Sequence, residues 1–279
     1  MEMVTPAGQS RISVRARRRQ RRTELPPLPS GLRRVEVWLV PLALLGFVGL
    51  WESVIYWGAY PAFILPSPSR VSARFLDVLA DGTLLHHTWV TASESLLGFA
   101  LGFAVATVVG YLLAKSPLAE RLLSPYIIAS QAIPIVALAP LLILWFGTGL
   151  ASKVLVSALI VFFPILINTI VGVRSVDPEW MDLMRALTAS PWQILTKVEI
   201  PAALPVLFGG LKVGVTLSVV GAVVGEFVGA DRGLGFLVNL SRGLFDTPLM
   251  FVSILTLVAL ALALYSVVFL LEKAIVHWK

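Results

Sequence analysis

Residues 154–173 read VLVSALIVFFPILINTIVGV, a run without a charged side chain. About 20 predominantly apolar residues in a helix are enough to cross the hydrocarbon core of a bilayer. Further predominantly apolar runs of comparable length lie at residues 37–57, 89–114, 126–147, 206–229 and 249–271. The sequence therefore predicts an all-α membrane protein with six transmembrane helices.

The composition excludes a soluble globular enzyme. The 279 residues are 57% hydrophobic and 14% charged, whereas soluble domains carry about 25% charged residues. There is no Cys, and the only histidines are His86, His87 and His277, which lie outside or at the ends of the predicted spans. We therefore expect no catalytic residues, no metal site and no covalent chemistry.

The distribution of positive charge predicts the orientation. Lys and Arg are retained on the cytoplasmic side of membrane proteins. With both termini cytoplasmic, the outer segments hold only Arg70, Arg74, Lys153, Arg232 and Arg242, and all other Lys and Arg lie inside. An even number of spans places the C-terminus on the same side as the N-terminus.

Residues 1–35 form an Arg-rich and Pro-rich segment that we expect to be a disordered cytoplasmic tail. Much of the net charge of +6 resides in this tail and not in a basic patch, so no nucleic-acid partner is expected. A signal peptide is the alternative, but the apolar run at 37–57 is longer than a secretory h-region of about 7–15 residues. Residues 36–279 are then the transmembrane domain.

Two segments between the spans carry helix signals. Ser67-Pro68 offers an N-cap followed by proline before an apolar face, and Asp81-Gly82 ends that helix. It lies on the outer leaflet or helps to receive an external partner. In the loop 174–205, a first short helix begins at Asp177, and a second begins with the capping box of Ser190 and Gln193 and ends at Ile200-Pro201.

The loop 174–205 resembles the cytoplasmic "EAA" coupling loop of ATP-binding cassette (ABC) importer permeases. The resemblance rests on Asp182-Leu183-Met184, then Thr188 after three intervening residues, and Val198-Glu199-Ile200-Pro201 after nine more intervening residues. Thr188 occupies the place of the family's turn glycine. Threonine is a poor choice where the turn needs positive φ, so either this turn differs or the aligned position is shifted.

The resemblance extends over nearly all of the chain after residue 36. Leu65-Pro66-Ser67-Pro68, Gln131-Ala132-Ile133-Pro134 and the segment from Gly221 to Gly235 are similar to the nitrate, sulfonate and taurine permease group, and most similar to its riboflavin and thiamine-pyrimidine branch. The resemblance implies a bacterial-type multi-pass permease of the cell inner membrane. Two copies would enclose a pathway, an ABC ATPase would dock below, and an extracytoplasmic substrate-binding protein would deliver the solute.

The same resemblance implies the residues that couple the permease to the ATPase. They are Asp182, Leu183, Met184, Arg185, Ala186, Leu187, Thr188, Val198, Ile200 and Pro201. The chain has no G-x-x-x-x-G-K-[ST] sequence, so ATP and Mg are expected on the partner ATPase and no cofactor on this chain.

The intramembrane polar and small residues are the candidates for the substrate pathway. A charge inside a bilayer is costly and usually faces a cavity or a partner. The candidates are Glu226, Glu94, Gly221, Gly225, Gln131 and Asn168, with Glu52 as a weaker one. The stripe of small residues from Gly210 to Gly229 is typical of close helix packing; lining of the pathway is the alternative.

The sequence leaves three functions to compare. The leading one is the permease of an ABC importer for riboflavin or a thiamine-related pyrimidine, with nitrate, taurine or a sulfonate as the alternative solute. An ion-coupled secondary transporter would need titratable residues near the midplane, whereas Glu52, Glu94 and Glu226 lie in the outer halves of their spans. An intramembrane enzyme lacks a nucleophile–base pair.

Overall fold

The computed structural model describes residues 30–58 and 61–277 and divides the chain into two units. The first contains α2 (Ser30–Gly58), which begins inside the segment 1–35 that the sequence predicts to be disordered. The rest of that predicted tail, residues 1–29, lies outside the described residues.

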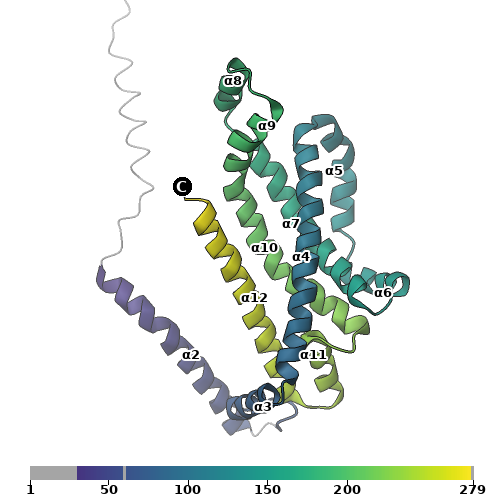
Figure 1. Cartoon of the computed structure of the whole chain (residues 1–279). Helices are drawn as coiled ribbons and strands as arrows, with labels where there is room; N and C mark the ends of the chain where they lie inside the picture. Colours follow the sequence, from purple (N-terminus) through teal and green to yellow (C-terminus); the bar gives the residue numbers. More distant parts are fainter. Residues whose placement is uncertain (1–29, 59–60, 278–279) are drawn as a thin grey trace, which may run out of the picture. The chain divides into compact units, whose positions relative to one another are not determined.

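All regular secondary structure in the described residues of the second unit is helical (Figure 1). Its elements are α3 (Pro68–Ala80), α4 (Thr83–Lys115), α5 (Pro117–Gln131), α6 (Ile135–Phe146), α7 (Leu150–Arg174), α8 (Pro178–Ala186), α9 (Pro191–Ile194), the π-helical turn η1 (Leu195–Glu199), α10 (Ile200–Gly229), α11 (Leu234–Gly243) and α12 (Thr247–Ile275). As predicted, Ser67 caps α3 by accepting a hydrogen bond from the Arg70 N–H.

Among the described residues, five helices are long and apolar enough to span a membrane, and there is a sixth span only if a bent pair counts as one. The prediction of one continuous third span at 126–147 is wrong, because α5 and α6 meet at 91°. Pro134 explains the break. Proline disfavours helical backbone in the residue before it, so α5 ends at Gln131 and Pro134 becomes the N-cap of α6.

The predicted end of the second loop helix at Ile200-Pro201 is also wrong. The chain stays helical from Pro191 to Gly229, and η1 ends at Glu199, two residues before Pro201. Proline inside an α-helix lacks an N–H and clashes with the preceding turn. Here a π-helical turn precedes Pro201, and the helix continues through it.

The centre of the second unit is α7, which packs between α4 and α10. Small residues allow the close approach: a Cβ atom on Gly102 would lie 2.7 Å from the Ala158 carbonyl oxygen, and one on Gly221 would lie 2.5 Å from the Ser157 Cα. Gly210, Gly214 and Gly225 likewise face side chains of α7. Of the two interpretations of the stripe, these contacts are those of helix packing.

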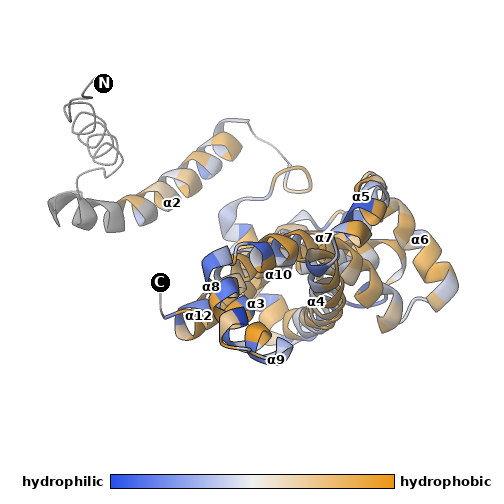
Figure 2. Cartoon of the chain, turned by 90° about the horizontal axis from the view of Figure 1, so that it is seen from above, coloured by the Kyte–Doolittle hydropathy of each residue, from blue (hydrophilic) through white to orange (hydrophobic). Residues whose placement is uncertain are grey.

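The outer surface of the bundle is strongly apolar. Seen along the bundle, α6 carries hydrophobic residues over most of its length (Figure 2). Only 6% of the apolar window of α12 is buried within the chain. Such a surface suits lipid or another transmembrane helix.

Candidate functional site

The helix pair α8–α9 projects at one end of the second unit, opposite the end where α3 and α11 lie (Figure 1). Its predicted caps are confirmed. The Asp177 carboxylate accepts a hydrogen bond from the Glu179 N–H at 2.9 Å. Ser190 and Gln193 form the reciprocal capping box, with 3.3 Å from the Gln193 N–H to Ser190 Oγ and 2.8 Å from the Ser190 N–H to Gln193 Oε1. Local sequence therefore defines both helix starts.

The turn between the two helices resolves the question raised by Thr188. Thr188 has φ +51°, in the left-handed region normally occupied by glycine. Its N–H donates to the Arg185 carbonyl and the Ala189 N–H donates to the Met184 carbonyl, both at 3.0 Å. This pairing is a Schellman motif, so the turn keeps positive φ with a threonine in place.

The residues predicted for coupling extend along the projecting pair and its base. Asp182 to Ala186 lie on α8, Leu187 and Thr188 in the turn, Val198 in η1, and Ile200 and Pro201 at the start of α10. No residue of α8 or α9 is buried. Large apolar side chains are exposed here, with 65% of Leu187 and 70% of Trp192 accessible. An exposed apolar helix pair of this kind is suited to the groove of a partner protein.

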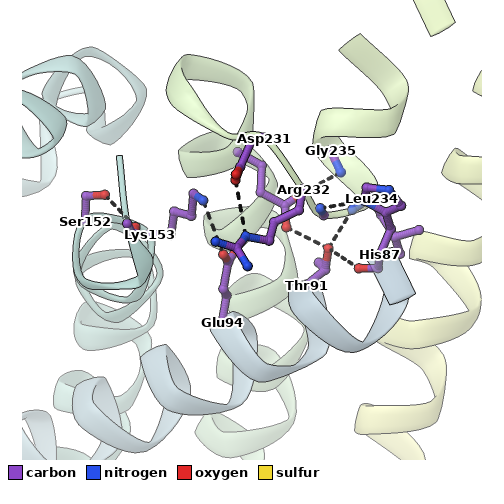
Figure 3. Close-up of polar contacts among 12 residues, drawn as sticks. His87, Thr91, Glu94, Ser152, Lys153, Asp231, Arg232, Leu234 and Gly235 are labelled. Atoms are coloured by element: carbon purple, nitrogen blue, oxygen red, sulfur yellow. Dashed lines mark hydrogen bonds and ion pairs between the residues drawn. The ribbon is translucent and has the colours of Figure 1, made fainter. Parts of the chain in front are cut away.

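A cluster of buried polar side chains lies at the opposite end and caps α11 (Figure 3). The Glu226 carboxylate accepts hydrogen bonds from Thr91 Oγ1 at 2.6 Å and from the Gly235 N–H. Thr91 Oγ1 accepts one from the Leu234 N–H at 2.7 Å, and His87 Nδ1 accepts one from the Gly233 N–H at 2.9 Å. Side chains of α4 and α10 thus satisfy the free N–H groups at the start of α11.

Glu94 and Lys153 form the second part of this cluster. Lys153 Nζ lies 3.5 Å from Glu94 Oε1, and both side chains are nearly inaccessible, at 3% and 2% exposed. Glu94 also interacts electrostatically with Glu226. Glu94 Oε2 is buried and has no hydrogen-bond partner among the described residues. The cluster therefore holds two carboxylates for one ammonium group.

A cavity of about 270 Å³ borders this cluster, lined by Glu94 and Lys153 together with Trp89, Asp231 and Arg232. The Asp231 side chain is exposed, and its pKa is lowered by a hydrogen bond from its own backbone N–H and by the charge of Arg232. Asp231 is therefore an anion at neutral pH. Among the residues that the structure describes, no group of three or more His, Asp and Glu could hold a metal ion.

The structure brings only some of the predicted pathway residues together. Glu94 and Glu226 meet in the polar cluster. Gln131 lines a different cavity of about 560 Å³ beside Arg174, and Asn168 donates a hydrogen bond to the Pro164 carbonyl at 2.8 Å within α7. Gly221 and Gly225 lie against α7, and Glu52 belongs to α2, in the other unit.

Sequence reasoning missed Thr91 and Lys153. Lys153 stands directly before the apolar run at 154–173, and the sequence places it in an outer loop. Because α7 begins at Leu150, this residue lies inside the helix, and its side chain is part of the cluster. The position of a lysine next to a run of small and apolar residues is the signal that could have located it.

Residues 102–277 match the family described as "Binding-protein-dependent transport system inner membrane component". The chain belongs to this family. The permease is 49% identical, over 92% of its length and 97% of the relative, to the riboflavin transport system permease protein RibX of Chloroflexus aurantiacus. It is 34% identical, over 78% of its length and 86% of the relative, to the formylaminopyrimidine transport permease protein ThiX of Halalkalibacterium halodurans.

The fold of the permease is similar to that of a solved ABC transporter. A chain from inward-facing conformations of the MetNI methionine ABC transporter superposes with a TM-score of 0.59 at 23% identity, over 67% of this chain and 94% of that one. The resemblance to ABC importer permeases and to the riboflavin and thiamine-pyrimidine branch is thus confirmed. The chain is an inner-membrane transport subunit of an ABC importer and not an enzyme.

Proposed function

We propose that this permease carries riboflavin across the membrane, receiving it from an external binding protein. The observation that carries the proposal is the 49% identity to a riboflavin permease over nearly the whole of both chains. The permease for formylaminopyrimidine is a more distant relative, so a thiamine-related pyrimidine is the second candidate solute. Nitrate, taurine and sulfonates follow as solutes of the wider group.

The energy for transport is proposed to come from an ABC ATPase that binds α8–α9. The exposed apolar side chains Trp180, Leu187 and Trp192 support this assignment, because they lose contact with water when a partner's groove covers them. ATP and Mg would be bound by that partner. In the proposed orientation of the permease in the membrane, α8–α9 and both termini lie in the cytoplasm.

A homodimer is proposed to enclose the pathway. The apolar and largely unburied surface of α12 is available for a second copy or for lipid. Glu94 has the strongest support among the candidate pathway residues. The candidates are Glu226, Glu94, Gly221, Gly225, Gln131 and Asn168. Glu94 borders the 270 Å³ cavity and carries a buried oxygen without a partner among the described residues.

The experiment is uptake of labelled riboflavin by a riboflavin auxotroph without its own uptake system, expressing the permease with its ATPase and binding protein. We expect riboflavin to be taken up, and we expect an excess of formylaminopyrimidine to leave this uptake unchanged. Uptake of the pyrimidine without uptake of riboflavin would move the assignment to the second solute. Riboflavin uptake that persists without the ATPase and stops with a protonophore would point to a secondary transporter.

A further inference from the structure

Glu199 is a buried carboxylate at the base of the projecting helix pair. It is the last residue of η1 and is 3% exposed. It forms an ion pair with Lys115 and accepts a hydrogen bond at 3.1 Å from the Tyr111 hydroxyl. Lys115 Nζ also lies 5.6 Å from the centroid of the Tyr111 ring. Both partners belong to the last turns of α4, so η1 is joined to α4 as well as to α10.

The contact is expected to resist separation. Removing one partner of a buried ion pair leaves an uncompensated charge, which costs far more than losing an exposed pair. Glu199 is buried, whereas Lys115 is partly exposed. The carboxylate therefore depends on α4 for its neutralisation, and a shift of η1 is expected to move the end of α4 with it.

The backbone at this point is unusual as well. In the described part of the chain, η1 is the one π-helical turn. Such turns are rare in proteins, and those that occur are often found at functional sites. This turn lies where α9 continues into α10, so η1 is one of the two covalent connections between the projecting pair and the bundle, the other being the segment between α7 and α8. Glu199 thus lies on one covalent path from α8–α9 into the bundle.

The space beside this junction permits movement. A cavity of about 300 Å³ is lined by residues of α4, α7, η1 and α10, including Tyr111 and Glu199. Thr107 also lines it, and its buried hydroxyl has no hydrogen-bond partner among the described residues. Close-packed interiors resist displacement, and here a cavity lies beside the polar contact between α4 and η1.

We propose that Glu199 is a positioning residue that transmits ATPase-driven movement of α8–α9 to α4, through Lys115 and Tyr111. This inference rests on the proposed docking of an ATPase at α8–α9. The helix α10 receives the movement through the continuous backbone, while α4 receives it through the Glu199 carboxylate. Both helices that flank α7 then move together.

The test measures the two helices separately in the complex of permease and ATPase. Because the chain has no Cys, Val108→Cys reports on α4 and Val213→Cys on α10; both positions are exposed. The labelling rate of each is compared with and without ATP and vanadate. In Glu199→Gln, the nucleotide-dependent change at position 108 is expected to fall roughly tenfold, while that at 213 persists.

Two further variants complete the design. Glu272→Gln removes the carboxylate of the Lys212–Glu272 pair, which joins α10 to α12 away from η1, and should leave both reporters unchanged. The exchanged pair Lys115→Glu with Glu199→Lys should restore much of the response at 108, and it carries the test if Glu199→Gln does not fold.

An unchanged response at 108 in Glu199→Gln would overturn the inference. So would equal loss at 108 and 213 with the ATPase still bound, because Glu199 would then support the helix pair as a whole. Failure of the starting protein to bind the ATPase, or to respond at either position, would instead reject the proposed docking and the inference with it.

Discussion

Individual side chains have different structural roles at the two ends of the bundle: they form a turn at one end and cap a helix at the other. At one end, Thr188 takes a left-handed conformation that costs a β-branched residue roughly 1–2 kcal/mol, and the Schellman hydrogen bonds hold it there. At the other end, Glu226 and Thr91 replace the backbone partners that the start of α11 lacks. The role of Glu226 can be tested separately from transport.

Glu226→Gln is expected to destabilise the permease. The carboxylate accepts from Thr91 Oγ1 and from the Gly235 N–H with separate oxygens; the amide has only one oxygen, so one of these two hydrogen bonds is lost, and a buried polar group without its partner costs about 1–3 kcal/mol. Thermal unfolding in detergent should show a melting temperature lower by several degrees. Ser93→Ala, on the same helix as Thr91, is the control. Unchanged stability with loss of transport would place Glu226 in the pathway and not in a cap.

The residue scale also shows what the sequence predicts well. The caps at Asp177 and at Ser190 with Gln193 depend on residues two or three positions apart, and local pattern was sufficient to find them. Lys153 meets Glu94 only because α4 crosses α7 at glycines. That crossing is a tertiary property, and no local pattern contains it.

The sequence predicts the helices correctly except at prolines, because a proline can either end a helix or lie within it. Pro134 ends a helix and bends the chain by 91°, whereas Pro201 lies within a continuous one. Pro164 and Pro205 also lie inside helices, so the presence of a proline alone does not predict which of the two effects it has. The apolar runs, by contrast, predicted the helices of the remaining spans, with boundaries shifted by several residues.

Gly221→Leu is expected to separate α10 from α7. A Cβ at this position already meets the Ser157 Cα at 2.5 Å, and backbone atoms cannot yield as side chains do. The amount of monodisperse permease recovered by size-exclusion chromatography should fall sharply. Gly209→Leu, on the same helix, meets no atom closer than 4.0 Å and should be tolerated. Normal recovery of Gly221→Leu with blocked uptake would favour the pathway interpretation of the stripe.

The second unit of the molecule is a bundle with one exposed helix pair at one end and a buried polar cluster at the other. The distribution of Lys and Arg predicts that the first end is cytoplasmic. In the absence of native cysteines, single cysteines at Ser116 and Asp231 can be labelled with an impermeant reagent in sealed cells. We expect labelling at 231 and protection at 116, and the reverse result would invert the orientation.

The central claim is that an ATPase drives this permease by binding α8–α9, and Leu187→Asp tests it most directly. Leu187 is 65% exposed in the chain alone, so the substitution should leave insertion and folding intact. In the partner's groove it would bury an unpaired carboxylate, at a cost of several kcal/mol.

The measurement is co-purification of the ATPase with the permease, followed by riboflavin uptake. We expect Leu187→Asp to lose both. Gln193→Glu is the control, because it adds the same charge nearby and keeps the oxygen that accepts from the Ser190 N–H; it should retain both. If Leu187→Asp binds the ATPase and transports as well as the unsubstituted protein, α8–α9 is not the coupling surface.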